Sequence, residues 1–333
     1  MSRPIDSEEP WRYDLFTLLR WLERERPERP RVGASTRRSG DLASLEQDPF
    51  LAFPASNVSR VEMGPDGRLD LSVRFLGLLG PQGALPLSMT EEAHFWQLAD
   101  DDAFPRFLDI FNNRFIQLFY RAWADARPIT HHDRPDADRF LAYVGSVVGL
   151  GTEGAPVPGA VPTLAKAGFA GLLSARVKSA SRLRSFLAGL FDVEVDVVEF
   201  VPTALALAPE EQSRLGMASS ALGVDLMVGS SVLTFDEKVR LRVTVASLSD
   251  YETFLPSGPN ASRLADAIGF YLGDELDWDI ELALPTAAAP PARLGVAGRL
   301  GWTAWMNPQH PEQSAAVLAD ARFRPSRPTA PTP

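Results

Sequence analysis

The side chains best suited to chemistry in this sequence are the histidine pair and its acidic neighbour at positions 131–133. His131, His132 and Asp133 form its one histidine cluster, and imidazole and carboxylate groups are common metal ligands. Neighbouring residues of a strand point to opposite sides, so such a pair rarely binds one metal ion. His94 and His310 are isolated in the sequence. The spacing therefore predicts no metal site.

Three glycines and an acidic run could also indicate ligand binding. Gly77, Gly80 and Gly83 differ in spacing from the dinucleotide fingerprint, and no lysine follows them as in a phosphate-binding loop. The acidic run at 100–102 lacks the spaced oxygen ligands of a calcium loop. The sequence has no cysteine and no G-x-S-x-G nucleophile motif. We therefore predict no catalytic residue, no cofactor and no enzymatic activity.

Charge and composition limit the kinds of partner. A net charge of −10 over 333 residues argues against a nucleic-acid-binding protein, because binding phosphates needs a basic surface. Residues 1–9 lack the basic start and apolar core of a secretion signal, and glycines and prolines interrupt the weakly charged stretch 141–165. Together with the lack of cysteine, these features predict a cytoplasmic protein without direct membrane insertion.

Two segments share one layout, in which an alternating strand leads into a long apolar segment ending in Leu-Pro. Apolar and polar residues alternate over 69–75 and again over 239–245, which predicts two strands with one buried face each. An exposed apolar loop usually marks a docking site for another protein, whereas the alternative is an ordinary surface turn. We predict two protruding protein-binding loops. Their contact residues would be Leu76, Leu78, Leu79, Pro81, Leu85 and Pro86 in the first loop, and Leu248, Tyr251, Phe254, Leu255 and Pro256 in the second.

Helical periodicity dominates the rest of the N-terminal half. Apolar residues recur at helical spacing over 11–22, and the segment ends before Pro27, which predicts an amphipathic helix. A second apolar stripe over 104–122 is rich in aromatic residues and could face either the core or a partner helix. The aromatic residues that we expect either in the core or against a partner helix are Trp11, Phe111, Phe115, Phe119 and Trp123.

The whole pattern predicts an α+β fold of two related strand–long loop–helix units with additional helices, elongated rather than compact. We expect the units at 1–145 and 163–321, joined by a proline- and glycine-rich connection at 146–162 and followed by a disordered tail at 322–333. A second internal echo relates residues 214–223 to residues 293–301. It fits gene duplication, or convergence on small glycine-rich turns.

Taken in order, these pieces resemble the TssG family (also called ImpH or VasB) of type VI secretion baseplate subunits. The most specific matches are L-G-L-L-G-P-Q-G-A-L-P at 76–86 and L-F-Y-R-A-W at 118–123. Further matching pieces are 10–16, 19–23, 31–33, 50–53, 107–114, 254–256, the two Arg-Leu-Gly turns and Trp302. The sequence departs from the pattern at Ser249-Asp250, where Gly-Pro is expected, and at 201–204, which lacks a tryptophan.

This resemblance implies a non-enzymatic wedge component of a contractile injection machine. It implies two copies of TssF, the sheath-initiating TssE and TssK trimers as partners, with the trimers held by two protruding loops. It also implies wedge assembly around the VgrG spike hub, in a baseplate docked at the inner-membrane complex of a Gram-negative bacterium. The sequence leaves two alternatives, a phage-tail-like baseplate protein of another contractile machine and an unrecognised hydrolase or ligand-binding enzyme.

Overall fold

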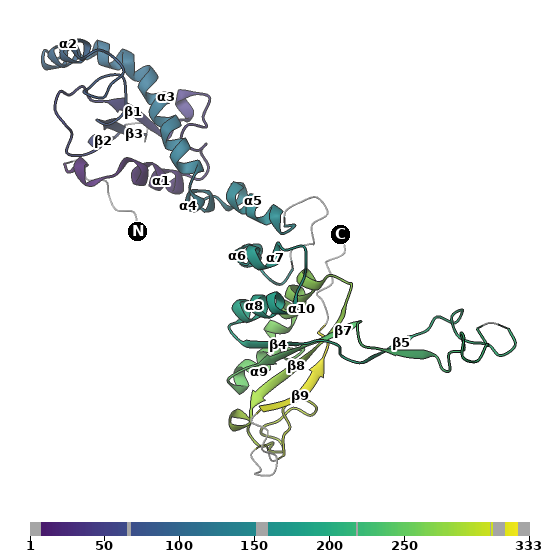
Figure 1. Ribbon diagram of the computed structural model, residues 1–333. Helices are drawn as coiled ribbons and strands as arrows, with labels where there is room; N and C mark the ends of the chain where they lie inside the picture. Colours follow the sequence, from purple (N-terminus) through teal and green to yellow (C-terminus); the bar gives the residue numbers. More distant parts are fainter. Residues whose placement is uncertain are drawn as a thin grey trace. The chain divides into compact units, whose positions relative to one another are not determined.

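A computed structural model describes residues 8–64, 68–150, 159–217, 219–306, 308 and 317–325. Contacts within the chain divide it into two units between Leu141 and Ala142, and each unit is described here by itself (Figure 1). Both units combine helices with small open sheets, which confirms the predicted α+β class.

The first unit contains a three-stranded sheet of order β1-β3-β2. Strand β1 is parallel and β2 antiparallel to the central strand β3. The elements are η1 (Pro10–Arg12), α1 (Leu15–Glu25), η2 (Arg38–Gly40), β1 (Ala43–Gln47), β2 (Val58–Met63), β3 (Leu69–Val73), α2 (Leu87–Leu98), α3 (Ala103–Asp125), α4 (Pro128–His132), η3 (Pro135–Ala137) and α5 (Arg139–Val147), the last of which crosses the boundary between the units.

Helices α1 and α3 supply the apolar cover of this sheet. The alternating apolar residues of β3 are fully buried, and they share one core with Leu19 of α1 and with Ile116 and Tyr120 of α3. The predicted N-terminal helix is confirmed, but it begins at Leu15. The reason is an N-cap, because the carboxylate of Asp14 accepts a hydrogen bond from the Thr17 N–H at 3.0 Å.

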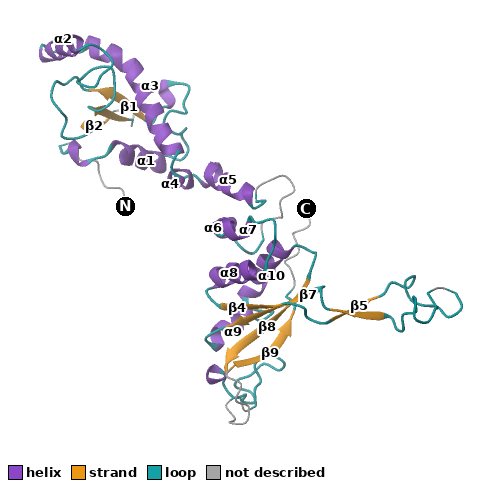
Figure 2. Ribbon diagram, viewed as in Figure 1, coloured by secondary structure: helices purple, strands orange, loops and turns teal. Residues whose placement is uncertain are grey.

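The second unit contains a four-stranded sheet of order β4-β7-β8-β9 and a separate hairpin of β5 and β6 (Figure 2). The central strands β7 and β8 are parallel, and the outer strands β4 and β9 are antiparallel to them. The elements are α6 (Thr163–Gly168), α7 (Ala170–Leu173), α8 (Ala180–Phe191), β4 (Glu194–Val198), β5 (Thr203–Ala206), β6 (Ser231–Thr234), β7 (Lys238–Thr244), α9 (Leu248–Phe254), α10 (Pro259–Leu272), β8 (Asp277–Pro285), η4 (Thr286–Ala288) and β9 (Val317–Phe323).

The core of the second unit lies between one face of the four-stranded sheet and helices α8, α9 and α10. Leu241 of β7 and Ile280 of β8 are fully buried there with Phe186 of α8 and Ile268 of α10. The residues that alternate with them along β7 and β8 are mostly charged, and they point to the opposite face of the sheet. This unit is therefore a two-layer structure with one face of its sheet uncovered by helices.

The second predicted loop is part of this core, so the prediction that it protrudes is wrong. Residues 248–254 form helix α9, in which the Ser247 hydroxyl caps the first turn by accepting the Asp250 N–H at 3.1 Å. Tyr251 and Phe254, spaced at helical period, and the following Leu255 are each at most 2% exposed. The Ser-x-x-Asp sequence therefore starts a helix where a strand-supported loop was expected.

Two predicted boundaries fall at the edge of the described residues. Strand β9 includes Arg322 and Phe323, so the prediction that the tail begins at 322 is wrong, and the reason is that both residues pair with β8. Residues 326–333 of that tail, and residues 151–158 of the predicted connection, lie outside the described residues. No helix among the described residues is long and apolar enough to cross a membrane.

We predict that Phe254→Ala destabilises the second unit by about 3–5 kcal/mol, because it removes a buried ring and leaves a cavity beneath α9. Denaturant unfolding of the full chain measures the change. The matched control is Phe235→Ala, which removes an exposed ring from the same unit. Equal unfolding midpoints for the two variants would contradict the burial of α9.

Candidate protein-binding surfaces

The first predicted loop, residues 76–86, also folds inward. Leu79 is buried, and the three other leucines of the segment are half-buried against the cores of the first unit. Among the six predicted contact residues, Pro81 and Pro86 alone are exposed. The prediction that the leucines of this segment protrude is therefore wrong.

Buried polar side chains hold the backbone of this segment. The Leu79 N–H donates to the Gln47 side-chain oxygen at 2.9 Å, and the Gln47 amide in turn donates to the Leu79 carbonyl. The N–H groups of the residues on either side donate to Asn112 at 3.2 Å and to Thr90 at 3.0 Å. The backbone groups at residues 78–80 therefore find partners inside the protein, so Leu79 is buried without leaving them unsatisfied.

Helix α3 has a buried stripe and an exposed stripe. The buried stripe, which includes Leu108, Ile116 and Tyr120, faces the sheet and the first loop. Trp123 packs at the edge of the core and stacks on Phe16, with ring centroids 4.7 Å apart. The other aromatic residues predicted to face the core or a partner lie about half exposed or more: Trp11, Phe111, Phe115 and Phe119.

The most exposed apolar side chains of the second unit lie in two loops that were not among the predicted protein-binding segments. The hairpin loop, residues 207–230, joins β5 to β6 and extends beyond the four-stranded sheet (Figure 1). The sheet loop, residues 289–306, follows η4. Their apolar residues with at least 80% exposure are Leu215, Met217, Leu222, Val224, Val228, Leu294, Val296, Leu300 and Met306.

The two loops have glycines with matching backbone φ angles. Gly216 and Gly295, each directly after an Arg-Leu pair, have φ of +76° and +74°. Gly223 and Gly301, each directly after a second leucine, have φ of +80° and +82°. Such φ values favour glycine because a Cβ atom is strained there. The sequence echo between 214–223 and 293–301 thus corresponds to matching φ angles at two glycines of each loop, each beside an exposed leucine.

Hydrogen bonds within each loop maintain these conformations. In the sheet loop the Ala297 N–H donates to the Arg293 carbonyl at 2.9 Å, and the Arg293 N–H donates back to Ala297 at 2.8 Å. In the hairpin loop the Met227 N–H donates to the Ser213 hydroxyl at 2.8 Å. The sequence contains a signal for this exposure. The two outward leucines of each loop fit neither strand nor helix periodicity, and each is followed by a glycine. Exposed clusters of this kind usually mark protein-binding sites.

A polar groove of about 780 Å³ lies beside β1 in the first unit. Its walls include Arg60, Asp70, Arg106 and Asp109. Burial raises the pKa of Asp109 to about 6, in spite of hydrogen bonds to its carboxylate. A carboxyl group with a raised pKa in a cleft is typical of a catalytic site. The contacts of Asp109 distinguish a catalytic role from a structural one.

Those contacts give Asp109 a structural role at the open edge of the sheet. Its carboxylate accepts the Gln47 N–H at 2.9 Å, and Asn113, one helical turn later, accepts the Leu45 N–H at 2.9 Å. Four residues of helix rise about 6 Å and two residues of strand about 6.6 Å, so the two spacings match. Helix α3 thus caps the free donors of β1, which would otherwise be available to another strand.

The histidine cluster has no metal-binding arrangement. His131 is buried and its Nε2 lies 3.1 Å from the Asp125 carbonyl, while the His132 ring lies 3.8 Å from Asp138. Across the described ranges, no group of three or more His, Asp or Glu residues could hold a metal ion.

Taken together, these features define a protein with exposed apolar surfaces on two small α+β units. The family described as "Type VI secretion, TssG" matches residues 9–307. The chain therefore belongs to this family, as the resemblance of its sequence implied.

Two solved structures share the fold. One, at 23% identity and a TM-score of 0.51 over 67% of this chain and 95% of the other, belongs to "the type VI secretion system TssK-TssF-TssG baseplate subcomplex". The other, at 20% identity and a TM-score of 0.62 over 98% of this chain and 95% of the other, belongs to "the baseplate complex from the type VI secretion system". No curated protein matches the chain.

We predict that Asp109→Asn stabilises the first unit at neutral pH by on the order of 1 kcal/mol. The native pKa of Asp109 is raised to about 6 from 3.8, so the native state binds more protons and stability falls as the pH rises from about 4 to 6. Asparagine keeps the acceptor and removes this fall. Thermal unfolding at pH 4 and pH 7 measures it, with the exposed Asp100→Asn as control. A stability difference from wild type that is equal at both pH values would contradict the role of the buried carboxylate.

Proposed function

We propose that the chain is a non-enzymatic structural subunit of the type VI secretion baseplate wedge. The observation that carries this proposal is the pair of matched apolar loops in a chain that belongs to the TssG family. The hydrolase alternative has less support, because the contacts of Asp109 with Gln47 and Asn112 give it a structural role at the edge of β1. The phage-tail alternative has less support because of the family match.

We assign the binding of TssK trimers to the hairpin loop and the sheet loop, one trimer to each. The matching glycine φ angles and outward leucines of the two loops suit two copies of one partner. The sequence predicted that segments 76–86 and 248–256 bind this partner. We assign the binding to the two loops instead, because the leucines and aromatic residues of those segments are packed inside the units. TssK is named together with TssG in one of the two solved assemblies, and this supports the choice of partner.

We assign TssF to the exposed aromatic stripe of α3. Phe107 and Phe111 contact each other edge to face at 5.8 Å and remain about half exposed, and Phe115 continues the same stripe. An apolar stripe at helical spacing is normally covered by another helix. Two copies of TssF, TssE and assembly around the VgrG hub complete the proposed environment, in the cytoplasm at the inner-membrane complex of a Gram-negative bacterium.

We predict that Leu215→Ser/Leu222→Ser removes one TssK trimer from the co-purified wedge and that Leu294→Ser/Leu300→Ser removes the other. Each truncated anchor should weaken binding by about 1–4 kcal/mol. Native mass spectrometry of co-expressed subunits counts the trimers. The control, Leu164→Ser/Val177→Ser, removes exposed apolar side chains from the same unit outside the loops. Full TssK stoichiometry in the combined four-residue variant would overturn the assignment.

We predict that Phe111→Ser/Phe115→Ser releases TssF while TssK stays bound, because the stripe and the loops belong to different units. Affinity purification on a tag attached to this chain, with TssF and TssK co-expressed, measures both. The exposed Phe140→Ser on α5 is the control. Loss of TssK together with retention of TssF would contradict this division of the surfaces.

A further inference from the structure

One face of the four-stranded sheet carries charged side chains in place of a helical layer. We call it the charged sheet face; it consists of Lys238, Arg240, Arg242, Asp277, Asp279, Glu281, Arg322 and Arg324. It follows from strand geometry, because the residues between them on β7 and β8 point into the core. Five cations share this face with three carboxylates of β8, and the exposed Glu194 and Asp196 of β4 lie on the same face.

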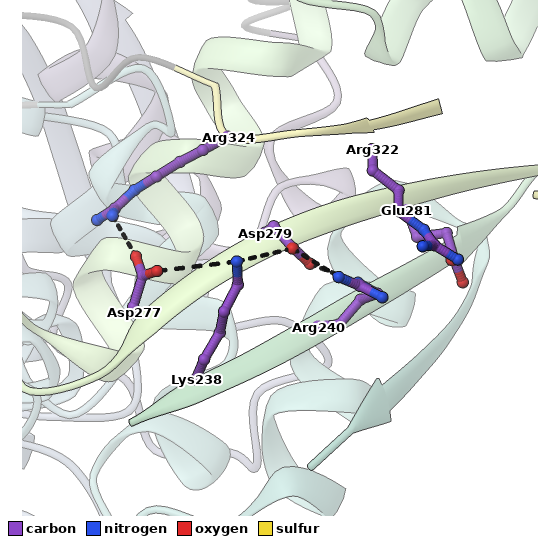
Figure 3. Close-up of polar contacts among 7 residues, drawn as sticks. All are labelled: Lys238, Arg240, Asp277, Asp279, Glu281, Arg322 and Arg324. Carbon is purple, nitrogen blue, oxygen red and sulfur yellow. Dashed lines mark hydrogen bonds and ion pairs between the residues drawn. The ribbon is translucent and has the colours of Figure 1, made fainter. Parts of the chain in front are cut away.

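The ion pairs of the face form two groups. In the first, a chain of contacts leads from Arg324 through Asp277, Lys238 and Asp279 to Arg240 (Figure 3). Lys238 Nζ lies 3.0 Å from Asp279 and 3.9 Å from Asp277, and Arg240 binds Asp279 through two nitrogens at 2.7 and 2.9 Å. The charges of this group are therefore mutually engaged.

The second group leaves hydrogen-bond donors unused. The carboxylate of Glu281 is 1% exposed and accepts Nε of Arg242 at 2.6 Å and Nε of Arg322 at 2.7 Å. Each arginine uses Nε alone, and its terminal nitrogens donate to no acceptor in the part of the chain that the structure describes. The two side chains are 45% and 56% exposed. One buried carboxylate thus fixes two guanidinium groups beside each other with their outer donors facing solvent.

Such a pair is suited to carboxylates. A guanidinium held in place by Nε can receive a carboxylate on its terminal nitrogens, and little side-chain freedom is then lost on binding. Asp196 of β4 is exposed directly across from Arg242, so the charges of the whole face balance. The binding feature is therefore the pair of guanidinium groups itself, which can receive single carboxylates at short range.

We propose that the charged sheet face docks an acidic segment of a partner polypeptide, with Asp or Glu carboxylates received by Arg242 and Arg322. The site shares no residue with either apolar loop or with α3, so it adds a polar contact to the apolar ones. It predicts binding that weakens with salt, in contrast to the contacts of the loops.

The experiment measures binding of a fluorescein-labelled oligoglutamate peptide to the full chain by anisotropy. The variant R242Q/E281Q/R322Q removes both guanidinium groups and the carboxylate that they cover, so no unpaired buried charge remains. We expect binding about tenfold weaker than wild type. R242K/R322K keeps the charges beside Glu281 but has no guanidinium donors, and we expect it to bind about threefold more weakly.

The matched control is R176Q/R184Q, which removes two exposed arginines from the same unit and is expected to bind like wild type. The proposal is overturned if the triple variant binds as tightly as wild type, or if the control loses as much affinity as the triple variant. It is also overturned if oligothymidylate or inorganic phosphate binds wild type more tightly than the peptide, because the ligand would then be a phosphate.

Discussion

Each unit buries one face of one small sheet beneath its helices. This constraint determines which apolar and charged side chains remain at the surface. Helices α1 and α3 supply the apolar layer of the first sheet, and α8, α9 and α10 supply that of the second. A small cluster of Leu79, Ala93 and Leu108 buries some further apolar residues of the first unit, and others in both units stay exposed. The aromatic stripe of α3 and the leucines of the hairpin loop and the sheet loop are therefore available to partners.

The satisfaction of backbone polar groups decides which apolar segments turn inward. Leu79 is buried because Gln47, Asn112 and Thr90 accept or donate the hydrogen bonds of the backbone at residues 78–80. In the two Arg-Leu-Gly loops, glycines in the left-handed region and local hydrogen bonds complete the backbone without help from the core. Leucine- and glycine-rich sequences are thus packed against the core at residues 76–86 and exposed in the two Arg-Leu-Gly loops.

The sequence predicted local structure better than exposure. The strands predicted over 69–75 and 239–245 and the helix predicted over 11–22 correspond to β3, β7 and α1, and the family followed from short motifs. Whether Leu79 or Leu215 faces water depends on side chains distant in sequence, such as Gln47 and Thr90, which no local pattern pairs with the loop. The Ser247 cap was visible as Ser-x-x-Asp, yet the similarity between 69–86 and 239–256 favoured a loop there.

In the proposed assembly, partners contact the two glycine-framed loops and leave the segments packed inside the units untouched. Hydrogen exchange of the chain, alone and in complex with TssK, tests this directly. We expect slower exchange on binding at residues 214–229 and 293–301, with residues 76–86 and 248–256 unchanged. Slower exchange confined to 76–86 and 248–256 would contradict it.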